Sequence, residues 1–197
     1  IDTDCIKHVK IPKFPAYTAK PVDVCFSLLE YPKKVNNPTL LQSKFHELLP
    51  LYNGYHHIYT DGSKEDEVAS YGLWCDAKPE GTSARIRDGS SIFTAELEGI
   101  KFALRYIRIS FRKKFVIFCD SKSVLESIDN HLTDNPLVVE VLDEIQELIS
   151  RFDKIIQFCW VPSHVGITGN VKADKAANEG RAKEENTSLL IPSSDLI

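Results

Sequence analysis

Tyr55-His56-His57-Ile58-Tyr59-Thr60-Asp61-Gly62-Ser63 is the stretch that most restricts the fold of this chain. Its aromatic and β-branched residues predict a central strand at about 55–61. The Asp-Gly-Ser sequence at its end predicts a backbone bend, because glycine has no Cβ to restrict the main chain. The stretch therefore predicts a carboxylate, Asp61, held on a central strand.

Three more acidic residues lie on or beside predicted helices and strands, which would hold their side chains in place. Glu96 lies one turn into a helix predicted at 92–109, whose apolar residues recur at helical spacing. Asp120 follows the apolar run of a strand at 115–119, at the carboxyl end where α/β sheets gather ligands. Asp174 lies in the polar opening of a final helix at about 170–184, and His164 precedes it by ten residues in a glycine-containing loop.

Each of these five residues also has an ordinary structural explanation. An aspartate before glycine is common in turns, and a glutamate in a first helical turn favours the helix dipole. Asp120 is placed to cap the following helix, and Asp174 and His164 suit a solvated surface. Taken singly, the ordinary explanation is the better one at every position. All five in one consistent order are improbable as a coincidence.

The predicted elements between these residues alternate regularly. Strands at 55–61, 68–76 and 82–88 predict an antiparallel meander with turns at 62–67 and 78–81. After the helix at 92–109 we expect a strand at 115–119, helices at 121–131 and 136–150, a strand at 154–161 and the final helix. Pro136 is predicted to open the helix at 136–150, and Ser188–Ile197 is predicted to be disordered. In the segment before the meander, only Leu40–Leu49 predicts a helix.

With these residues and this order, the chain resembles type 1 ribonuclease H, and more narrowly the domain carried by retrotransposon polyproteins with a non-LTR reverse transcriptase. The resemblance runs from about Tyr55 to about Arg181. It rests on four motifs: Ile58-Tyr59-Thr60-Asp61-Gly62-Ser63-Lys64, Thr94-Ala95-Glu96-Leu97, Phe118-Cys119-Asp120-Ser121, and Trp160-Val161-Pro162-Ser163-His164-Val165-Gly166 followed by Gly169-Asn170 and Ala173-Asp174. The resemblance implies an α/β, ribonuclease H-like fold with a mixed five-stranded sheet, three antiparallel strands then parallel ones, and helices on both faces.

The implied activity is metal-dependent hydrolysis of the RNA strand of an RNA/DNA hybrid, which in a retroelement removes the template RNA. In-line attack on a phosphodiester adds negative charge at two oxygens, and two Mg²⁺ ions held by hard carboxylate ligands stabilise it. By resemblance Asp61, Glu96, Asp120 and Asp174 hold these ions, with Mn²⁺ as a substitute, and His164 relays protons or eases product release. The residues expected to contact substrate are Ser63, Thr94, Ser121, Ser123 and Asn170.

Length and composition agree with one domain and two extensions. The 197 residues, 43% of them hydrophobic, predict a ribonuclease H domain at 55–184, an N-terminal connection segment at 1–54 and a C-terminal tail at 185–197. Five cysteines without a Cys-x-x-Cys pair predict buried thiols in a reducing, intracellular compartment. No run is apolar enough for a membrane span or signal peptide. The absence of methionine favours a piece excised from a polyprotein, and we expect a monomer that works with an upstream reverse transcriptase domain.

The distribution of charge leaves two interpretations open. The net charge of −4 disfavours a nucleic-acid binder, because affinity for nucleic acid comes largely from basic contacts to phosphate. However, Lys101, Arg105, Arg108 and Arg112 form a basic stripe along the helix at 92–109. A solvated outer helix face and a phosphate-tracking surface explain the stripe equally well.

Two rival functions have the same fold. One is a binding module that holds nucleic acid or a protein without cleaving it, which the four carboxylates disfavour because they repel one another unless metal is present. The other is a transposase or integrase, which the positions of Glu96 and His164 disfavour.

The sequence departs from cellular ribonucleases H in two features that bind substrate. The stretch between Asp120 and His164 is short and leaves little room for a basic protrusion, and Ile92-Phe93-Thr94-Ala95 lacks the paired asparagines of cellular members. The resemblance therefore does not extend to the asparagines that contact the RNA 2′-hydroxyl in cellular members.

Overall fold

A mixed six-stranded sheet forms the centre of the molecule in the computed structural model, which describes residues 6–7, 22–130, 133–192 and 195. The strand order is β2-β7-β6-β3-β4-β5. Strands β3, β4 and β5 form the antiparallel meander, while β3, β6, β7 and β2 run parallel. Their bounds are β2 Asp23–Cys25, β3 His56–Glu65, β4 Val68–Cys75, β5 Lys78–Arg85, β6 Lys114–Cys119 and β7 Ile155–Trp160. The predicted ribonuclease H-like fold is confirmed.

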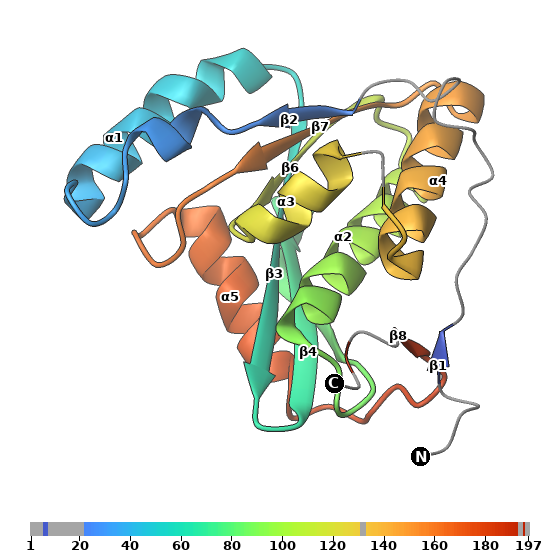
Figure 1. Ribbon diagram of the computed structural model, residues 1–197. Coiled ribbons are helices and arrows are strands. Elements are labelled where there is room, and N and C mark those ends of the chain that lie inside the picture. The colour runs from blue at the N-terminus through green and yellow to red at the C-terminus, as the bar shows by residue number, and fades with distance from the viewer. Residues whose placement is uncertain (1–5, 8–21, 131–132, 193–194, 196–197) are drawn as a thin grey trace.

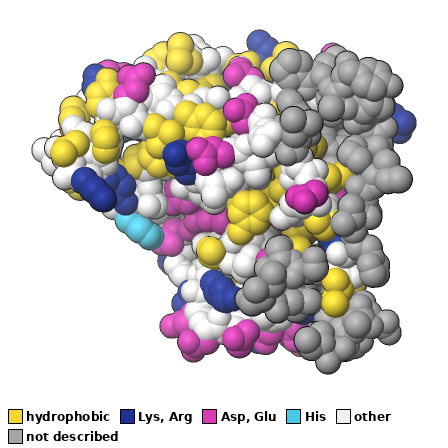
Figure 2. Space-filling view, viewed as in Figure 1, with side chains coloured by type: hydrophobic (Ala, Val, Ile, Leu, Met, Phe, Trp, Pro, Cys, Tyr) yellow, Lys and Arg dark blue, Asp and Glu magenta, His cyan; other side chains and the backbone are white. Residues whose placement is uncertain are grey.

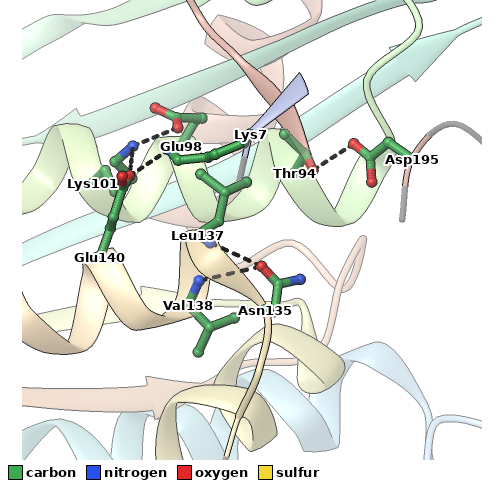
Figure 3. A network of polar contacts seen from close by, with 9 residues as sticks. All are labelled: Lys7, Thr94, Glu98, Lys101, Asn135, Leu137, Val138, Glu140 and Asp195. Carbon is green, nitrogen blue, oxygen red and sulfur yellow. Dashed lines mark hydrogen bonds and ion pairs between the residues drawn. The ribbon is translucent and has the colours of Figure 1, made fainter. Parts of the chain in front are cut away.

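Helices cover both faces of this sheet (Figure 1). One face packs against α2 (Ile92–Ile109), α3 (Lys122–Asp129) and α4 (Pro136–Arg151) through the larger apolar core. The other face packs against α1 (Pro38–Leu48), the 3-10 turns η2 (Ser27–Glu30) and η3 (Leu49–Tyr52), and α5 (Thr168–Gly180). Pro136 opens α4 as predicted, and Asn135 caps this helix by accepting hydrogen bonds from the backbone N–H of Leu137 and Val138 (Figure 3).

The N-terminal segment adds a strand that the sequence did not predict. Its strand β2 pairs parallel with β7, and Cys25 lies opposite Cys159. The helix at α1, close to the predicted Leu40–Leu49, buries Leu41 and Phe45 against the sheet. Three residues are too short to show an alternating pattern, so the sequence carried no usable signal for this sixth strand.

The turn predicted at Lys78–Gly81 is wrong. Strand β5 already begins at Lys78, which pairs with Cys75, so the hairpin turns at residues 76–77. Pro79 and Gly81 fall within a register shift of β5, where Gly81 has a positive φ of 72° and the Trp74 indole donates to the Pro79 carbonyl. Proline and glycine here mark a bulge in an edge strand, for which they are as well suited as for a turn.

The disorder predicted for Ser188–Ile197 is also wrong where the structure describes this segment; residues 193, 194, 196 and 197 lie outside the described part. Strand β8 (Ile191–Pro192) pairs parallel with β1 (Ile6–Lys7). The Asp195 carboxylate accepts hydrogen bonds from the Ser91 N–H at 2.8 Å and the Thr94 hydroxyl at 2.6 Å, at the start of α2. Pairing with a distant strand and a distant helix end cannot be read from local composition.

Part of the basic stripe of α2 lies at the interface between α2 and α4. Lys101 is buried, with its Nζ 2.7 Å from a Glu98 oxygen and 3.1 Å from a Glu140 oxygen of α4. Lys7 of β1 joins the same Glu140 (Figure 3). Farther along, Arg108 pairs with Glu147 of α4 at 2.9 Å. Lys101 and Arg108 therefore hold α2 against α4, and neither a solvated face nor a phosphate-tracking surface describes them.

We expect Gly72→Ala to destabilise the fold by about 1–3 kcal/mol, because a Cβ at Gly72 would lie 2.4 Å from the Ala173 carbonyl oxygen and from the Ala177 nitrogen, both backbone atoms of α5. Gly99→Ala is the matched control. Its Cβ would meet nothing closer than 3.4 Å, and alanine favours a helix over glycine by roughly 0.5–1 kcal/mol. Urea denaturation of both variants measures the difference, and equal midpoints would contradict the close α5–β4 packing.

Candidate active site

Three of the predicted catalytic carboxylates meet at one point. Asp61 of β3, Glu96 of α2 and Asp120, which follows β6, each bring an oxygen into a group whose members lie within 4.8 Å of one another. Asp61 and Glu96 are buried and Asp120 is half-buried. Figure 2 shows Asp and Glu side chains gathered in a recess of the surface, with a histidine at its margin. Residues as far apart in the sequence as Asp61 and Asp120 are thus brought to a common cluster.

Gly62 allows Glu96 to reach this cluster, and the bend predicted there is wrong. Strand β3 continues straight through Gly62 to Glu65, paired with β4 along its length. A Cβ at Gly62 would lie 2.9 Å from both the backbone nitrogen and Cγ of Glu96. The nearby Gly62 backbone lowers the pKa of Glu96, against the larger opposite effect of burial. The glycine is therefore required by the close approach of α2 to the strand.

Asp120 is held by groups from two other elements. Its backbone carbonyl accepts a hydrogen bond from the Trp160 indole at 2.9 Å, at the end of β7. One of its carboxylate oxygens accepts from the Asn170 side-chain amide at 3.0 Å, in the first turn of α5. The other side-chain atom of Asn170, Oδ1, is buried and has no hydrogen-bond partner among the described residues. Asn170 therefore contacts the cluster and has an unused acceptor beside it.

Asp174 and His164 lie at the open side of the cluster. Asp174 is half-buried on α5, close enough for its charge to raise the pKa of Asp61, and accepts a hydrogen bond from Asn178 at 3.2 Å. His164 is exposed in the loop between β7 and α5, where it has a left-handed φ of 54°. The structure thus places four carboxylates near one another and the histidine in an exposed loop beside α5.

Burial makes this cluster a poor place for uncompensated negative charge. Desolvation raises the pKa of Asp61 well above its ordinary value, and the charges of Asp120, Glu96 and Asp174 raise it further. Desolvation and the charge of Asp120 likewise raise the pKa of Glu96. Like charges in a low dielectric disfavour the ionised forms, whereas a bound cation reverses this effect.

The residues predicted to contact substrate differ in exposure and in whether their hydroxyl groups already have hydrogen-bond partners within the protein. Ser121 and Ser123 lie at the start of α3, half-buried and exposed respectively. The Thr94 hydroxyl is engaged by Asp195, as described above. The Ser63 hydroxyl donates to the Asn178 side chain at 2.8 Å and accepts from Arg181 at 2.5 Å. Their contacts with substrate stay a prediction.

Sequence reasoning missed Asn178, Arg181 and Cys119 as neighbours of the site. Asn178 of α5 and Arg181, the C-cap residue of this helix, follow Asp174 at helical spacing, and this spacing could have indicated them. Arg181 also pairs with Glu65 at 3.1 Å. The Cys119 thiol lies 3.8 Å from a Glu96 oxygen, a contact that only the packing of β6 against α2 creates.

The donor set fits a divalent metal site. Carboxylate oxygens are the ligands that hard divalent cations such as Mg²⁺ and Mn²⁺ prefer. Here three of them converge in a buried position where their own repulsion opposes ionisation. A cation would supply the missing positive charge. Asp61, Glu96 and Asp120 are therefore the residues that would hold a metal, with Asp174 beside them.

A comparison with protein-family models supports this interpretation, because the model for RNase H matches residues 53–182, about two thirds of the chain. The chain belongs to the ribonuclease H family. All four carboxylates and His164 lie within the matched ribonuclease H region, while β2 and α1 lie before it. No curated protein matches the chain.

One similar solved structure is an RNase H1 isolated from compost by a metagenomic approach. The two superpose with a TM-score of 0.51 at 20% sequence identity, over 65% of this chain and 96% of the compost protein. At this identity the likeness shows the ribonuclease H fold alone. None of the described helices is long and apolar enough to cross a membrane.

Proposed function

We propose that this protein is an endoribonuclease that hydrolyses the RNA strand of RNA/DNA hybrids with two divalent metal ions, Mg²⁺ or Mn²⁺. The observation that carries the proposal is the convergence of Asp61, Glu96 and Asp120 within 4.8 Å in a ribonuclease H fold. A binding module has no need of three acids that repel one another and a phosphate in a desolvated site. The cluster therefore favours catalysis over binding alone.

The proposed roles come from the resemblance to ribonuclease H. Asp61, Glu96 and Asp120 would hold the metals, together with Asp174 beside them. When bound, the metals supply charge stabilisation at the attacking and leaving oxygens of the phosphodiester. Asn170 orients Asp120 through its amide and offers a free acceptor toward the site. His164, exposed on its loop, would relay protons or ease product release.

We further propose that the chain is the ribonuclease H part of a retroelement polyprotein, which removes template RNA while acting as a monomer beside an upstream reverse transcriptase domain. The motif resemblance supports this context. Residues 22–54 would form the connection between the two activities, with β2 and α1 anchored on the sheet. Cys25, Cys75, Cys119 and Cys159 are free thiols, which supports an intracellular, reducing compartment.

Cleavage of end-labelled substrates tests the proposed activity. We expect the protein with Mg²⁺ or Mn²⁺ to cut the RNA strand of an RNA/DNA hybrid and to leave single-stranded RNA and duplex DNA intact. Asp120→Asn, purified in parallel, reports any contaminating nuclease, and strand transfer to DNA ends tests the integrase alternative. Hybrid binding in the presence of metal without any cutting would contradict the proposal and favour a binding module.

A further inference from the structure

A partly enclosed cavity of about 220 Å³ lies on the α5 face of the sheet, separate from the carboxylate cluster. Helix α1 forms one side, the end of the β7–α5 loop and the first turn of α5 form another, and β3 and β4 form the floor. Because α1 lies outside the region matched by the family model, the cavity combines the ribonuclease H domain with the N-terminal segment of this chain. Neither the fold nor the proposed catalysis explains it.

Three aromatic rings line this cavity. Phe45, Tyr59 and Trp74 are each at least nine-tenths buried, and the rings of Tyr59 and Trp74 lie 5.8 Å apart. Tyr59 is itself held in place by stacking on Phe118, with centroids 4.8 Å apart. Fixed aromatic walls favour a flat, aromatic ligand, because offset and edge contacts between rings are favourable and little side-chain freedom is lost.

One polar group of the cavity wall has no partner. Tyr59 is only 6% exposed, and no hydrogen-bond partner of its hydroxyl is found within the described residues. Burial raises the pKa of Tyr59, so the hydroxyl stays protonated and able to donate. A Cβ at Gly169 would lie 2.3–2.4 Å from Cε2, Cδ2 and Cζ of Tyr59, so the Tyr59 ring packs directly against the first turn of α5. The Tyr59 side chain lines the cavity and its hydroxyl keeps some exposure, so this hydroxyl is free to donate to a ligand oxygen or nitrogen.

The first turn of α5 supplies further donors. Its N-cap residue, Ile167, makes no side-chain capping bond, and the next two residues, Thr168 and Gly169, both line the cavity. The first N–H groups of a helix have no intrahelical acceptor, and together with the helix dipole they favour an anion. The N-terminus of α5, which has no side-chain cap, and Tyr59, whose hydroxyl has no partner among the described residues, thus line the same cavity.

Lys172 and the N-terminus of α5 favour an anionic ligand in the cavity. His46 and His57 line it, and Lys172 places its Nζ 4.2 Å from the centroid of Trp74. Asp76 is the acid that lines the same cavity among the described residues. The positive end of α5 and Lys172 outweigh this one carboxylate, so a ligand that combines an aromatic ring with a negative group is favoured over either part alone.

We propose that this cavity binds a nucleotide, with the base against Phe45, Tyr59 and Trp74 and the phosphate at the N-terminus of α5. Tyr59 and Asp61 face the same side of β3, about 7 Å apart along the strand, and Asn170, which follows Gly169, donates to Asp120. A nucleotide at an unpaired strand end could therefore occupy the cavity while the same strand enters the active site. This role as a substrate subsite rests on the proposed function, whereas nucleotide binding itself does not.

Binding is measured without divalent metal, in EDTA, so that phosphate is repelled from the carboxylate cluster and reports on the cavity alone. The probes are adenosine monophosphate, a short single-stranded oligonucleotide and inorganic phosphate. Binding of each probe is detected by equilibrium dialysis and by the change in fluorescence of Trp74, one of two tryptophans. We expect saturable binding of the mononucleotide at millimolar concentration. Tighter binding of the oligonucleotide identifies a strand end as the natural source, and equal binding identifies a free nucleotide.

Thr168 offers a matched pair of variants because it is exposed at the start of α5. Thr168→Asp adds a negative charge beside the phosphate and should bind at least about tenfold more weakly than the isosteric but uncharged Thr168→Asn. Thermal melts establish that both are folded. Absence of saturable mononucleotide binding in the wild type, equal affinity for inorganic phosphate, or no difference between the two variants would overturn the proposal. Loss of hybrid cleavage with nucleotide binding intact would instead contradict only the proposed function.

Discussion

The Asp61→Asn variant should lose hybrid cleavage by roughly a thousandfold or more. Asp61 is the carboxylate whose pKa responds to all three of Asp120, Glu96 and Asp174, so its oxygens lie at the centre of the cluster. Removing its charge leaves the metals underbound, and metal-assisted charge stabilisation contributes several kcal/mol to such reactions, with each 1.36 kcal/mol worth about tenfold in rate. The measurement is the single-turnover rate on an end-labelled hybrid.

Two further variants separate chemistry from a general loss of charge or fold. Asp129→Asn makes the same substitution at an exposed position on α3 and should cut at the wild-type rate. His164→Ala removes an exposed side chain that holds no metal in the proposed mechanism, so we expect a partial loss of roughly 10- to 100-fold, chiefly in turnover. An Asp61→Asn variant that cleaves at a rate similar to that of Asp129→Asn would rule out the metal cluster as the catalytic centre.

The metal-free protein should lose stability as the pH rises from about 5 to about 8. Desolvation and neighbouring charges raise the pKa values of Asp61 and Glu96 above those of the unfolded chain, which lie near 4. Between the unfolded and folded pKa values the folded state therefore binds more protons, so the free energy of unfolding decreases with increasing pH. We expect a fall of several degrees in melting temperature, at roughly 2–4 °C per kcal/mol for a domain of this size.

Mg²⁺ or Mn²⁺ should restore this stability at about pH 8 and have little effect at about pH 5, where protons compete for the carboxylates. Metal at a hundredfold excess over its dissociation constant stabilises by about 2.7 kcal/mol. Asp61→Asn, which cannot ionise there, should flatten the pH dependence and melt above the wild type in EDTA at high pH. A wild-type melting temperature that rises from about pH 5 to about pH 8 in EDTA would contradict the raised pKa values.

Much of the fold and the position of the acids could be predicted from the sequence, because their signals are local. The apolar run that ends before Asp120 and the helical spacing after Glu96 place each carboxylate on an element, and the order of elements restricts how these can be arranged. The structure brings Asp61, Glu96 and Asp120 together as that order implies. The catalytic and substrate-contacting roles of these residues, of Asp174 and of His164 stay predictions that the variants above test.

The wrong predictions concern residues whose structural role is set by contacts with residues far away in the sequence. Gly62 was predicted to bend the chain, but the strand is straight and the glycine makes room for Glu96. Pro79 and Gly81 were assigned to a turn, whereas they form a bulge against β4. Lys101 was placed on a basic outer face, yet it is buried between Glu98 and Glu140. In each case the residue type was consistent with both outcomes.

The sequence by itself determined the helices and the five main strands, and it placed each acid on or directly beside one of these elements, because hydrophobic periodicity and turn chemistry act over a few residues. Only the tertiary structure decided that β2 and α1 complete the sheet and its second face, that the C-terminal segment reaches Thr94, and that a cavity remains between α1 and α5. Those features depend on which surfaces remain uncovered once the sheet has formed, and that is a property of packing between residues far apart in the chain.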